Sequence, residues 1–160
     1  MGTGKTAASK ELAKTLELEL VDIDALIVQK EKRSINEIFS QSGETYFRKV
    51  EKETLKEVGA KTNQVVSCGG GIVIDPENTA IMKQTGRLIA LSASPEVILE
   101  RTKRHTQRPL LNVSNPLAKI KELLEVRKPY YEKAEFMLDT SDLSVKEVAQ
   151  KIIDRISPLP

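Results

Sequence analysis

Apolar residues along the chain alternate between short runs and stripes with helical spacing. The runs have the length of buried strands, and each is followed by polar or glycine-rich residues. The expected strands are 18–21, 64–68, 87–91 and 136–139. Stripes with a spacing of three or four predict helices between the strands. These helices are expected over 6–16, 25–39, 44–58, 117–131 and 145–156, with shorter helices starting near 75 and 94.

Local signals mark where several of these helices start and stop. Ser34 with Glu37 three residues later is typical of a capping box, which predicts that a new helix starts there. Gly43, after Ser42, is expected to break that helix before the next one begins. The stretch 103–115 is polar and basic, and we expect it to form a mobile loop.

The alternation of strands with helices indicates an α/β fold with a parallel sheet covered on both faces. The sequence contains 160 residues, of which 39% are hydrophobic and 30% charged. This length and composition suit one domain with its own core, and no linker divides residues 1–160.

Charge and composition exclude several kinds of partner. The net charge of +2 is typical of a mixed, solvated surface and does not favour nucleic acid or a membrane. No apolar run is long enough to span a bilayer. The single cysteine, Cys68, excludes an intramolecular disulfide and fits a reducing cytoplasm. We therefore expect a cytoplasmic protein, and a monomer.

The first residues carry the strongest chemical signal. Met1-Gly2-Thr3-Gly4-Lys5-Thr6 matches the second half of the phosphate-binding pattern G-x-x-x-x-G-K-[ST]. Backbone N–H groups of such a loop, together with the helix start that follows, bind phosphate oxygens. Lys5 would contact the β- and γ-phosphates of a nucleotide, and the Thr6 hydroxyl would be a Mg²⁺ ligand.

Two carboxylates follow the first expected strand. Asp22 and Asp24 are two residues apart, so on a continuing strand they would point to the same face. One could support Mg²⁺ and the other could accept a proton from a hydroxyl group. The alternative is that both cap the next helix, where acidic residues are favourable.

Glycines and arginines complete the set of candidate residues. The run Gly69-Gly70-Gly71 would let the backbone approach a ligand closely and offer N–H groups to it. Arg48 has Glu51 three residues later on the same helix, where the carboxylate could hold the guanidinium. Three other residues have solvent-exposed positions as the simplest alternative: His105, Arg108 and Arg127.

Taken together, these motifs resemble those of the shikimate kinase family. The order of the motifs is G-x-G-K-T, D-x-D, G-E-x-x-F-R, G-G-G, R-P-L-L and R-x-P-x-Y, and it covers essentially the whole chain. The resemblance implies a three-layer, P-loop, nucleoside-monophosphate-kinase-like fold with a parallel sheet of strand order 2-3-1-4-5. It also implies transfer of the γ-phosphate of ATP to the 3-hydroxyl of shikimate, on the route to chorismate and aromatic amino acids.

The resemblance assigns a role to each candidate residue. Asp24 is the implied base and orients the shikimate hydroxyls, in a shikimate-binding region at about 24–60. Thr6 and Asp22 support Mg²⁺, and Arg101 packs on adenine. Lys5 and Arg108 are both implied as catalytic and nucleotide-binding residues, and Arg108 arrives from the lid at about 103–115. The implied shikimate-binding residues are Asp24, Arg48, Gly69, Gly70, Gly71 and Arg127, and the implied nucleotide-binding residues are Gly2, Thr3, Gly4, Lys5, Thr6, Ala7, Arg101 and Arg108.

The start of the chain departs from the family pattern. The first glycine of the phosphate-binding pattern would lie two residues before Met1, after a strand that forms the centre of the family's sheet. Loss of this strand would leave backbone hydrogen-bonding groups unpaired, at a cost that a marginally stable domain can hardly bear. We therefore expect Met1 to be an internal methionine, with strand 1 encoded upstream of it.

Two alternative functions remain at this point. A related kinase for another carboxylated polyol, such as gluconate, would use similar arginines and glycines. A protein that binds the nucleotide or shikimate without turnover would fit the incomplete loop, although the other catalytic positions are filled.

Overall fold

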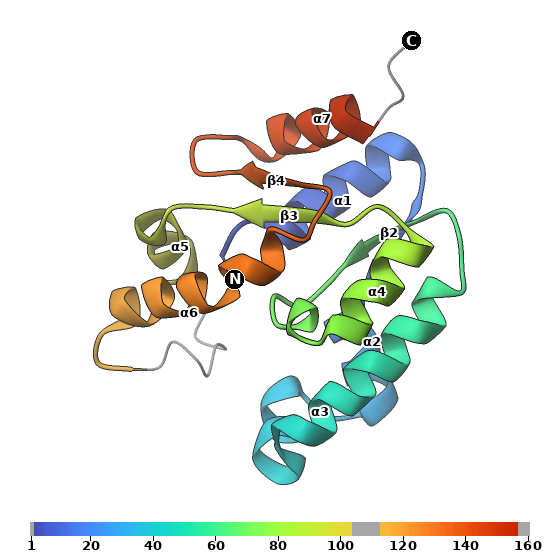
Figure 1. The fold of residues 1–160 in the computed structure, drawn as a ribbon, viewed down its shortest axis with the longest axis vertical. Helices are drawn as coiled ribbons and strands as arrows, with labels where there is room; N and C mark the ends of the chain where they lie inside the picture. Colours follow the sequence, from blue (N-terminus) through green and yellow to red (C-terminus); the bar gives the residue numbers. More distant parts are fainter. Residues whose placement is uncertain (1, 104–112, 157–160) are drawn as a thin grey trace. The chain divides into compact units, whose positions relative to one another are not determined.

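A computed structural model describes residues 2–103 and 113–156 of the chain (Figure 1). The chain forms two compact units, one of residues Ala13–Leu88 and one of Met1–Leu12 with Ile89–Pro160. Helix α1 (Lys5–Leu16) is divided between the two units. Its residues up to Leu12 belong to the unit that contains Ile89–Pro160, and its last turn belongs to the unit Ala13–Leu88. In the described ranges, no helix is both long and apolar enough to cross a membrane.

The unit Ala13–Leu88 contains a parallel pair of short strands. Strand β1 (Glu19–Asp22) pairs with β2 (Gln64–Ser67), with Asp22 opposite Ser67 at the carboxyl end. Because parallel strands end at the same edge of a sheet, Asp22 and the glycine-rich loop after β2 start from that edge. The helical elements of the unit are α2 (Ile23–Glu31), α3 (Ile35–Gly59), the short helix η1 (Ile72–Ile74) and α4 (Pro76–Thr85).

Helix α3 is the longest element of the chain and carries several candidate residues. The Ser34 hydroxyl accepts a hydrogen bond from Glu37 N at 3.2 Å, and the Glu37 carboxylate accepts one from Ser34 N at 2.7 Å. This confirms the predicted capping box. At Gly43 the backbone is left-handed, with φ of 80°, so the helix is kinked where a break was predicted. Three isoleucines of α2 and α3 are completely buried and contribute to the core on which these helices pack: Ile23, Ile27 and Ile38.

The other unit contains the second pair of parallel strands. Strand β3 (Ile89–Ser92) pairs with β4 (Phe136–Asp139), with Ile89 opposite Phe136 and Ser92 opposite Asp139, and Figure 1 shows the two strands side by side. The expected strand at 87–91 thus begins two residues later and ends one residue later in the structure. The remaining helices of the unit are α5 (Pro95–Thr102), α6 (Pro116–Tyr131) and α7 (Val145–Ile156).

Helix α7 shows that the apolar stripe identifies a packed face. Val148, Ala149 and Ile152 of this helix are buried, as the spacing predicted. Val145, the first residue of the stripe and of the helix, is 42% exposed. Elsewhere in the same unit, Ile98 of α5 and Ile120 of α6 form a second apolar cluster with Ala93.

Candidate active site

The start of helix α1 has the geometry of an anion site. Gly2 and Gly4 are left-handed, with φ of 65° and 83°, a conformation that residues with side chains rarely adopt. The helix follows at once, and Ala8 N donates to Gly4 O at 2.9 Å. The N–H groups of the first helical turn have no carbonyl partner within the helix, and the first turn contains no acidic side chain. A helix start that follows left-handed glycines in this way is the type of site that favours phosphate oxygens.

Four arginines were predicted to bind the nucleotide or the substrate, and three of them follow Arg48 in the chain. Arg101 lies in the last turn of α5 and donates from Nη1 to Thr140 Oγ1 at 3.1 Å and from Nη2 to Thr140 O at 2.8 Å. Arg127 lies on α6, is half-buried, and has no hydrogen-bond or ion-pair partner among residues 2–103 and 113–156. Arg108 and His105 lie outside the described residues, as does most of the predicted lid.

The two aspartates differ in their local structure, which corrects the prediction of a shared strand face. Asp22 is the last residue of β1 and the N-cap of α2, because its Oδ1 accepts from Ala25 N at 3.0 Å. The chain then turns into the helix at Ile23, so Asp24 lies in the first helical turn. The capping alternative therefore holds for Asp22, while the carboxylate of Asp24 extends from the helix towards the loop after β2.

The guanidinium of Arg48 is held by two carboxylates of its own helix, α3. Its Nη1 donates to Glu51 Oε2 at 2.8 Å, and its Nε and Nη2 donate to Glu44 Oε1 at 3.2 and 3.0 Å. An arginine has five N–H donors, so this arrangement holds the guanidinium while leaving donors for a bound carboxylate. The spacing of three residues predicted Glu51 as a partner of Arg48. Glu44 was not predicted, although its spacing of four residues from Arg48 could have indicated it.

The glycine loop lies directly against these charged groups. A β-carbon on Gly69 would be 3.3 Å from Asp24 Oδ1 and 3.4 Å from Glu51 Oε1. A β-carbon on Gly71 would be 2.7 Å from Arg48 Nη2, closer than real contacts allow. The structure therefore brings Asp24, Arg48 and the glycine loop together, and the lack of side chains at these glycines makes the approach possible.

Burial and charge act in opposite directions on the Arg48–Glu51 pair. Burial raises the pKa of the Glu51 carboxyl above its ordinary value, and the Arg48 guanidinium offsets only part of this effect. The pKa of Arg48 is also affected by burial, which lowers it, but bonds to Glu51 and Glu44 outweigh burial and raise it. Glu51 is only 1% exposed, so its carboxylate depends on Arg48 for compensation.

The raised pKa of Glu51 predicts how stability depends on pH. The folded state takes up a proton at a higher pH than the unfolded state, so the contribution is fully present below the ordinary value near 4.5 and is lost as pH rises through the folded value. The free energy of unfolding of the wild type, relative to Glu51→Gln, should therefore increase as pH falls from 7 towards 4.5. Urea unfolding of both proteins across this range measures the difference, and two parallel pH curves would contradict the prediction.

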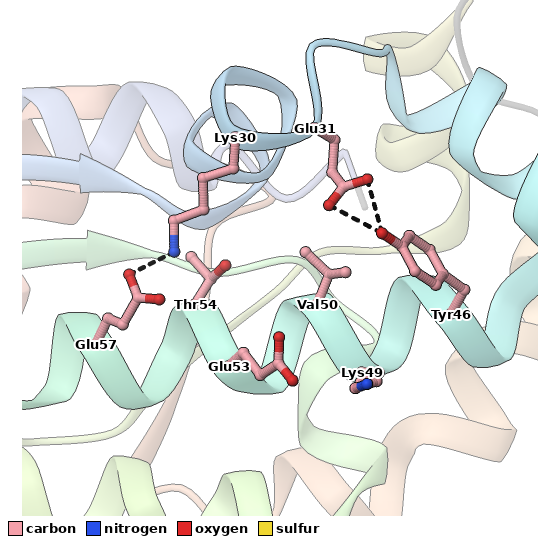
Figure 2. Close-up of a pocket in the computed structure, with 8 residues that line it drawn as sticks. All are labelled: Lys30, Glu31, Tyr46, Lys49, Val50, Glu53, Thr54 and Glu57. Atoms are coloured by element: carbon pink, nitrogen blue, oxygen red, sulfur yellow. Dashed lines mark hydrogen bonds and ion pairs between the residues drawn. The ribbon is translucent and has the colours of Figure 1, made fainter.

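A cavity of about 220 Å³ lies between α2 and α3, away from the groups just described. Figure 2 shows Thr54 below Lys30 and the Tyr46 hydroxyl facing both Glu31 oxygens. The hydroxyl oxygen is 3.1 and 3.0 Å from these oxygens, and its single proton is shared between them. The cavity is lined by a face of α3 that does not include Arg48 or Glu51, and none of the predicted site residues lines the cavity. The lining residues are Lys30, Glu31, Tyr46, Lys49, Val50, Glu53, Thr54 and Glu57.

Comparison with known proteins identifies the family. The sequence model of the family described as shikimate kinase matches residues 1–157. The chain belongs to the shikimate kinase family. A shikimate kinase of Thermodesulfovibrio yellowstonii is 48% identical over 153 residues, which cover 96% of this chain and 88% of that protein. A shikimate kinase of Thermus thermophilus is 43% identical over 157 residues, which cover 98% of this chain and 85% of that protein.

Solved structures of shikimate kinases show the same fold. The enzyme of Acinetobacter baumannii, solved in complex with shikimate, is 37% identical and superposes with a TM-score of 0.93, covering 98% of this chain and 88% of that chain. The enzyme of Bacteroides thetaiotaomicron is 29% identical with a TM-score of 0.91, covering 98% of this chain and 93% of that chain. These findings confirm the predicted family and its P-loop, nucleoside-monophosphate-kinase-like α/β fold.

Proposed function

We propose that this chain transfers the γ-phosphoryl group of ATP to the 3-hydroxyl of shikimate, giving ADP and shikimate 3-phosphate. The observation that carries the proposal is the cluster of Asp24, Arg48 and the glycine loop. It combines a guanidinium held by two carboxylates with a nearby carboxylate that can accept a proton. A substrate with both a carboxylate and hydroxyl groups matches this pair of functions.

In the proposed reaction, an oxygen–phosphorus bond forms as another breaks. The shikimate hydroxyl oxygen attacks the γ-phosphorus while its proton moves to Asp24. The bond from the γ-phosphorus to the bridging oxygen breaks, and ADP carries away the electron pair. Arg48 and Arg127 hold the shikimate carboxylate, and Gly69, Gly70 and Gly71 border the reacting groups. Most of the catalysis comes from alignment and from stabilisation of charge.

The nucleotide is held by the first residues of the chain. Gly2, Thr3, Gly4 and Ala7 contribute backbone N–H groups, Lys5 places a positive charge on the phosphates, and the face of the Arg101 guanidinium packs on adenine. Arg108 adds a further cation to the phosphates. The positive charges of Lys5 and Arg108 stabilise the negative charge that accumulates on the transferring phosphoryl group.

Thr6 and Asp22 would hold Mg²⁺ with the nucleotide. Asp22 uses one oxygen to cap α2, so its other oxygen can accept a metal ion or a metal-bound water. Residues 2–103 and 113–156 contain no group of three or more acidic, histidine or cysteine side chains that could hold a metal ion by itself. This fits an ion that takes most of its ligands from phosphates and water. When bound, Mg²⁺ neutralises charge on the β- and γ-phosphates.

A coupled assay of ADP release tests the proposed function. The assay offers ATP with shikimate or with gluconate, in the presence of Mg²⁺, and mass spectrometry identifies the phosphorylated product. We expect turnover with shikimate only. Turnover with gluconate only would mean that the chain is a sugar-acid kinase and not a shikimate kinase in activity. Calorimetric binding of shikimate without turnover would indicate a non-catalytic binder.

The single cysteine fits a cytoplasmic enzyme, and gel filtration would test the proposed monomer.

Gly71 gives a sharp test of the substrate site. In Gly71→Ala the new β-carbon would lie 2.7 Å from Arg48 Nη2, so the guanidinium must move. Because that group also compensates the buried Glu51 carboxylate, the melting temperature should fall as well, and the kinetics are measured well below it. The KM for shikimate should rise about 10- to 100-fold, as expected when a charge-assisted interaction is lost. Steady-state kinetics at saturating ATP measures the change.

Gly86→Ala is the matched control for this substitution. Gly86 has an extended backbone, and its β-carbon would meet only Met82 O, at 3.9 Å. We expect its kinetics to equal those of the wild type. An unchanged KM for shikimate in Gly71→Ala would show that Arg48 does not bind the substrate from this position.

A further inference from the structure

Thr140, directly after strand β4, lies at the centre of a small hydrogen-bond network. The residue is only 2% exposed. Its Oγ1 is 2.9 Å from Thr3 O, 3.0 Å from Ser92 O and 3.1 Å from Arg101 Nη1. One buried hydroxyl therefore connects the phosphate-binding loop, the end of β3 and helix α5.

Arginine determines the direction of these hydrogen bonds. The Arg101 guanidinium can only donate, so Thr140 Oγ1 accepts from it. The single hydroxyl proton is then directed to a backbone carbonyl, and both neighbouring carbonyls, Thr3 O and Ser92 O, are within range. Arg101 also donates from Nη2 to Thr140 O at 2.8 Å, so the side chain and backbone of Thr140 are held by the same guanidinium.

The loop at Thr3 needs support on its buried side. Thr3 is 4% exposed and lies between two left-handed glycines. Gly2 packs closely on α5, because a β-carbon there would be 3.0 Å from side-chain carbons of both Ile98 and Thr102. A buried carbonyl without a donor is costly, and Thr140 supplies the donor for Thr3 O.

We propose that Thr140 is a positioning residue for the phosphate-binding loop and that Arg101 directs its hydroxyl. The inference rests on the proposed function, in which Arg101 packs on the base and the loop binds the phosphates. The path Arg101–Thr140–Thr3 then connects the base end of the nucleotide site with its phosphate end. Thr140 touches no nucleotide atom in this scheme, and it acts by fixing the orientation of the backbone N–H groups around Thr3.

The competing explanation is that Thr140 only stabilises the fold. Its backbone N–H donates to Ser92 O at 2.9 Å, and this bond closes the ends of β3 and β4 whatever the side chain does. A purely structural hydroxyl would change the melting temperature and would weaken all ligands alike. A positioning hydroxyl would weaken ligands according to the phosphates they place on the loop.

The experiment compares ADP, AMP and shikimate binding by calorimetry in Thr140→Val, Thr140→Ala and Thr140→Ser. Both variants without the hydroxyl should bind ADP about 10-fold more weakly, the effect of one lost hydrogen bond to a buried group. AMP, which lacks the β-phosphate that the loop holds, and shikimate should bind within about 2-fold of the wild type. Thr140→Ser keeps the hydroxyl and should restore ADP binding.

Thr79→Val is the matched control, because Thr79 is another buried threonine, and its hydroxyl donates to Val73 O at 3.1 Å. It should lower the melting temperature but leave ADP affinity unchanged. The inference would be overturned if ADP and AMP lost affinity equally. It would also be overturned if Thr140→Val and Thr140→Ala both kept the wild-type affinity for ADP. A wild type that binds ADP but does not phosphorylate shikimate would refute the proposed function alone, and a wild type that does not bind ADP would refute both.

Discussion

Replacing Asp24 with asparagine should lower kcat for shikimate phosphorylation about 10²- to 10⁴-fold, the usual contribution of a general base. Asparagine has nearly the same shape, but its amide cannot take the proton from the attacking hydroxyl. The side chain of Asp24 packs near Gly69, with Oδ1 3.3 Å from the position of a β-carbon there, so asparagine should occupy the same place. The KM for shikimate should change much less than kcat. Steady-state kinetics with shikimate varied at saturating ATP gives the two values separately.

The control for this variant is Asp142→Asn. Asp142 is exposed in the turn before α7, and it has no role in the proposed reaction. Its kinetics should match those of the wild type. If Asp24→Asn keeps a kcat within about 3-fold of the wild type, Asp24 is not the base, since general-base catalysis contributes at least about 10²-fold.

Replacing Lys5 with methionine should have the second large effect, on the nucleotide. The methionine side chain is similar in length but removes the positive charge from the β- and γ-phosphates. We expect kcat/KM for ATP to fall about 10²- to 10³-fold, as for other preorganised groups that stabilise developing negative charge. The affinity for shikimate, measured by calorimetry without nucleotide, should stay within about 2-fold of the wild-type value.

Lys10→Met separates the position of the charge from the net charge. Lys10 is an exposed residue of the same helix, α1, so its replacement changes the net charge equally. It should leave kcat/KM for ATP unchanged. Equal losses in the Lys5 and Lys10 variants would mean that general electrostatic attraction, and not a contact from Lys5, governs nucleotide binding.

Features that depend on neighbouring residues were predictable from the sequence. The capping box of Ser34 and Glu37 is one example, because both partners lie within one helical turn. The buried face of α7 is another, since its spacing matches the helical repeat. The phosphate-binding loop was visible for the same reason, as its chemistry is contained in consecutive residues.

The aspartates show where a local pattern was insufficient. The sequence allowed a strand through Asp24 or a helix that starts after Asp22, and the strand was the wrong choice. In the structure, the Asp22 carboxylate satisfies the N–H of Ala25, and that bond starts the helix two residues earlier than expected. The two carboxylates therefore differ in position: Asp22 caps α2, and Asp24 lies in the first turn of that helix.

The amino-acid sequence by itself determined the family, the order of strands and helices, and the residue types needed for phosphoryl transfer, because these depend on consecutive or helically spaced residues. Tertiary structure alone decided which groups meet. It buried Glu51 beneath Arg48, placed Gly71 where only a hydrogen atom fits beside the guanidinium, and brought Thr140 to Thr3. The contacts of Gly71 with Arg48 and of Thr140 with Thr3 join residues from different elements. Arg48 and Glu51 are neighbours on one helix, so their spacing was visible, but the burial of Glu51 comes from packing around that helix, which no spacing along the chain records.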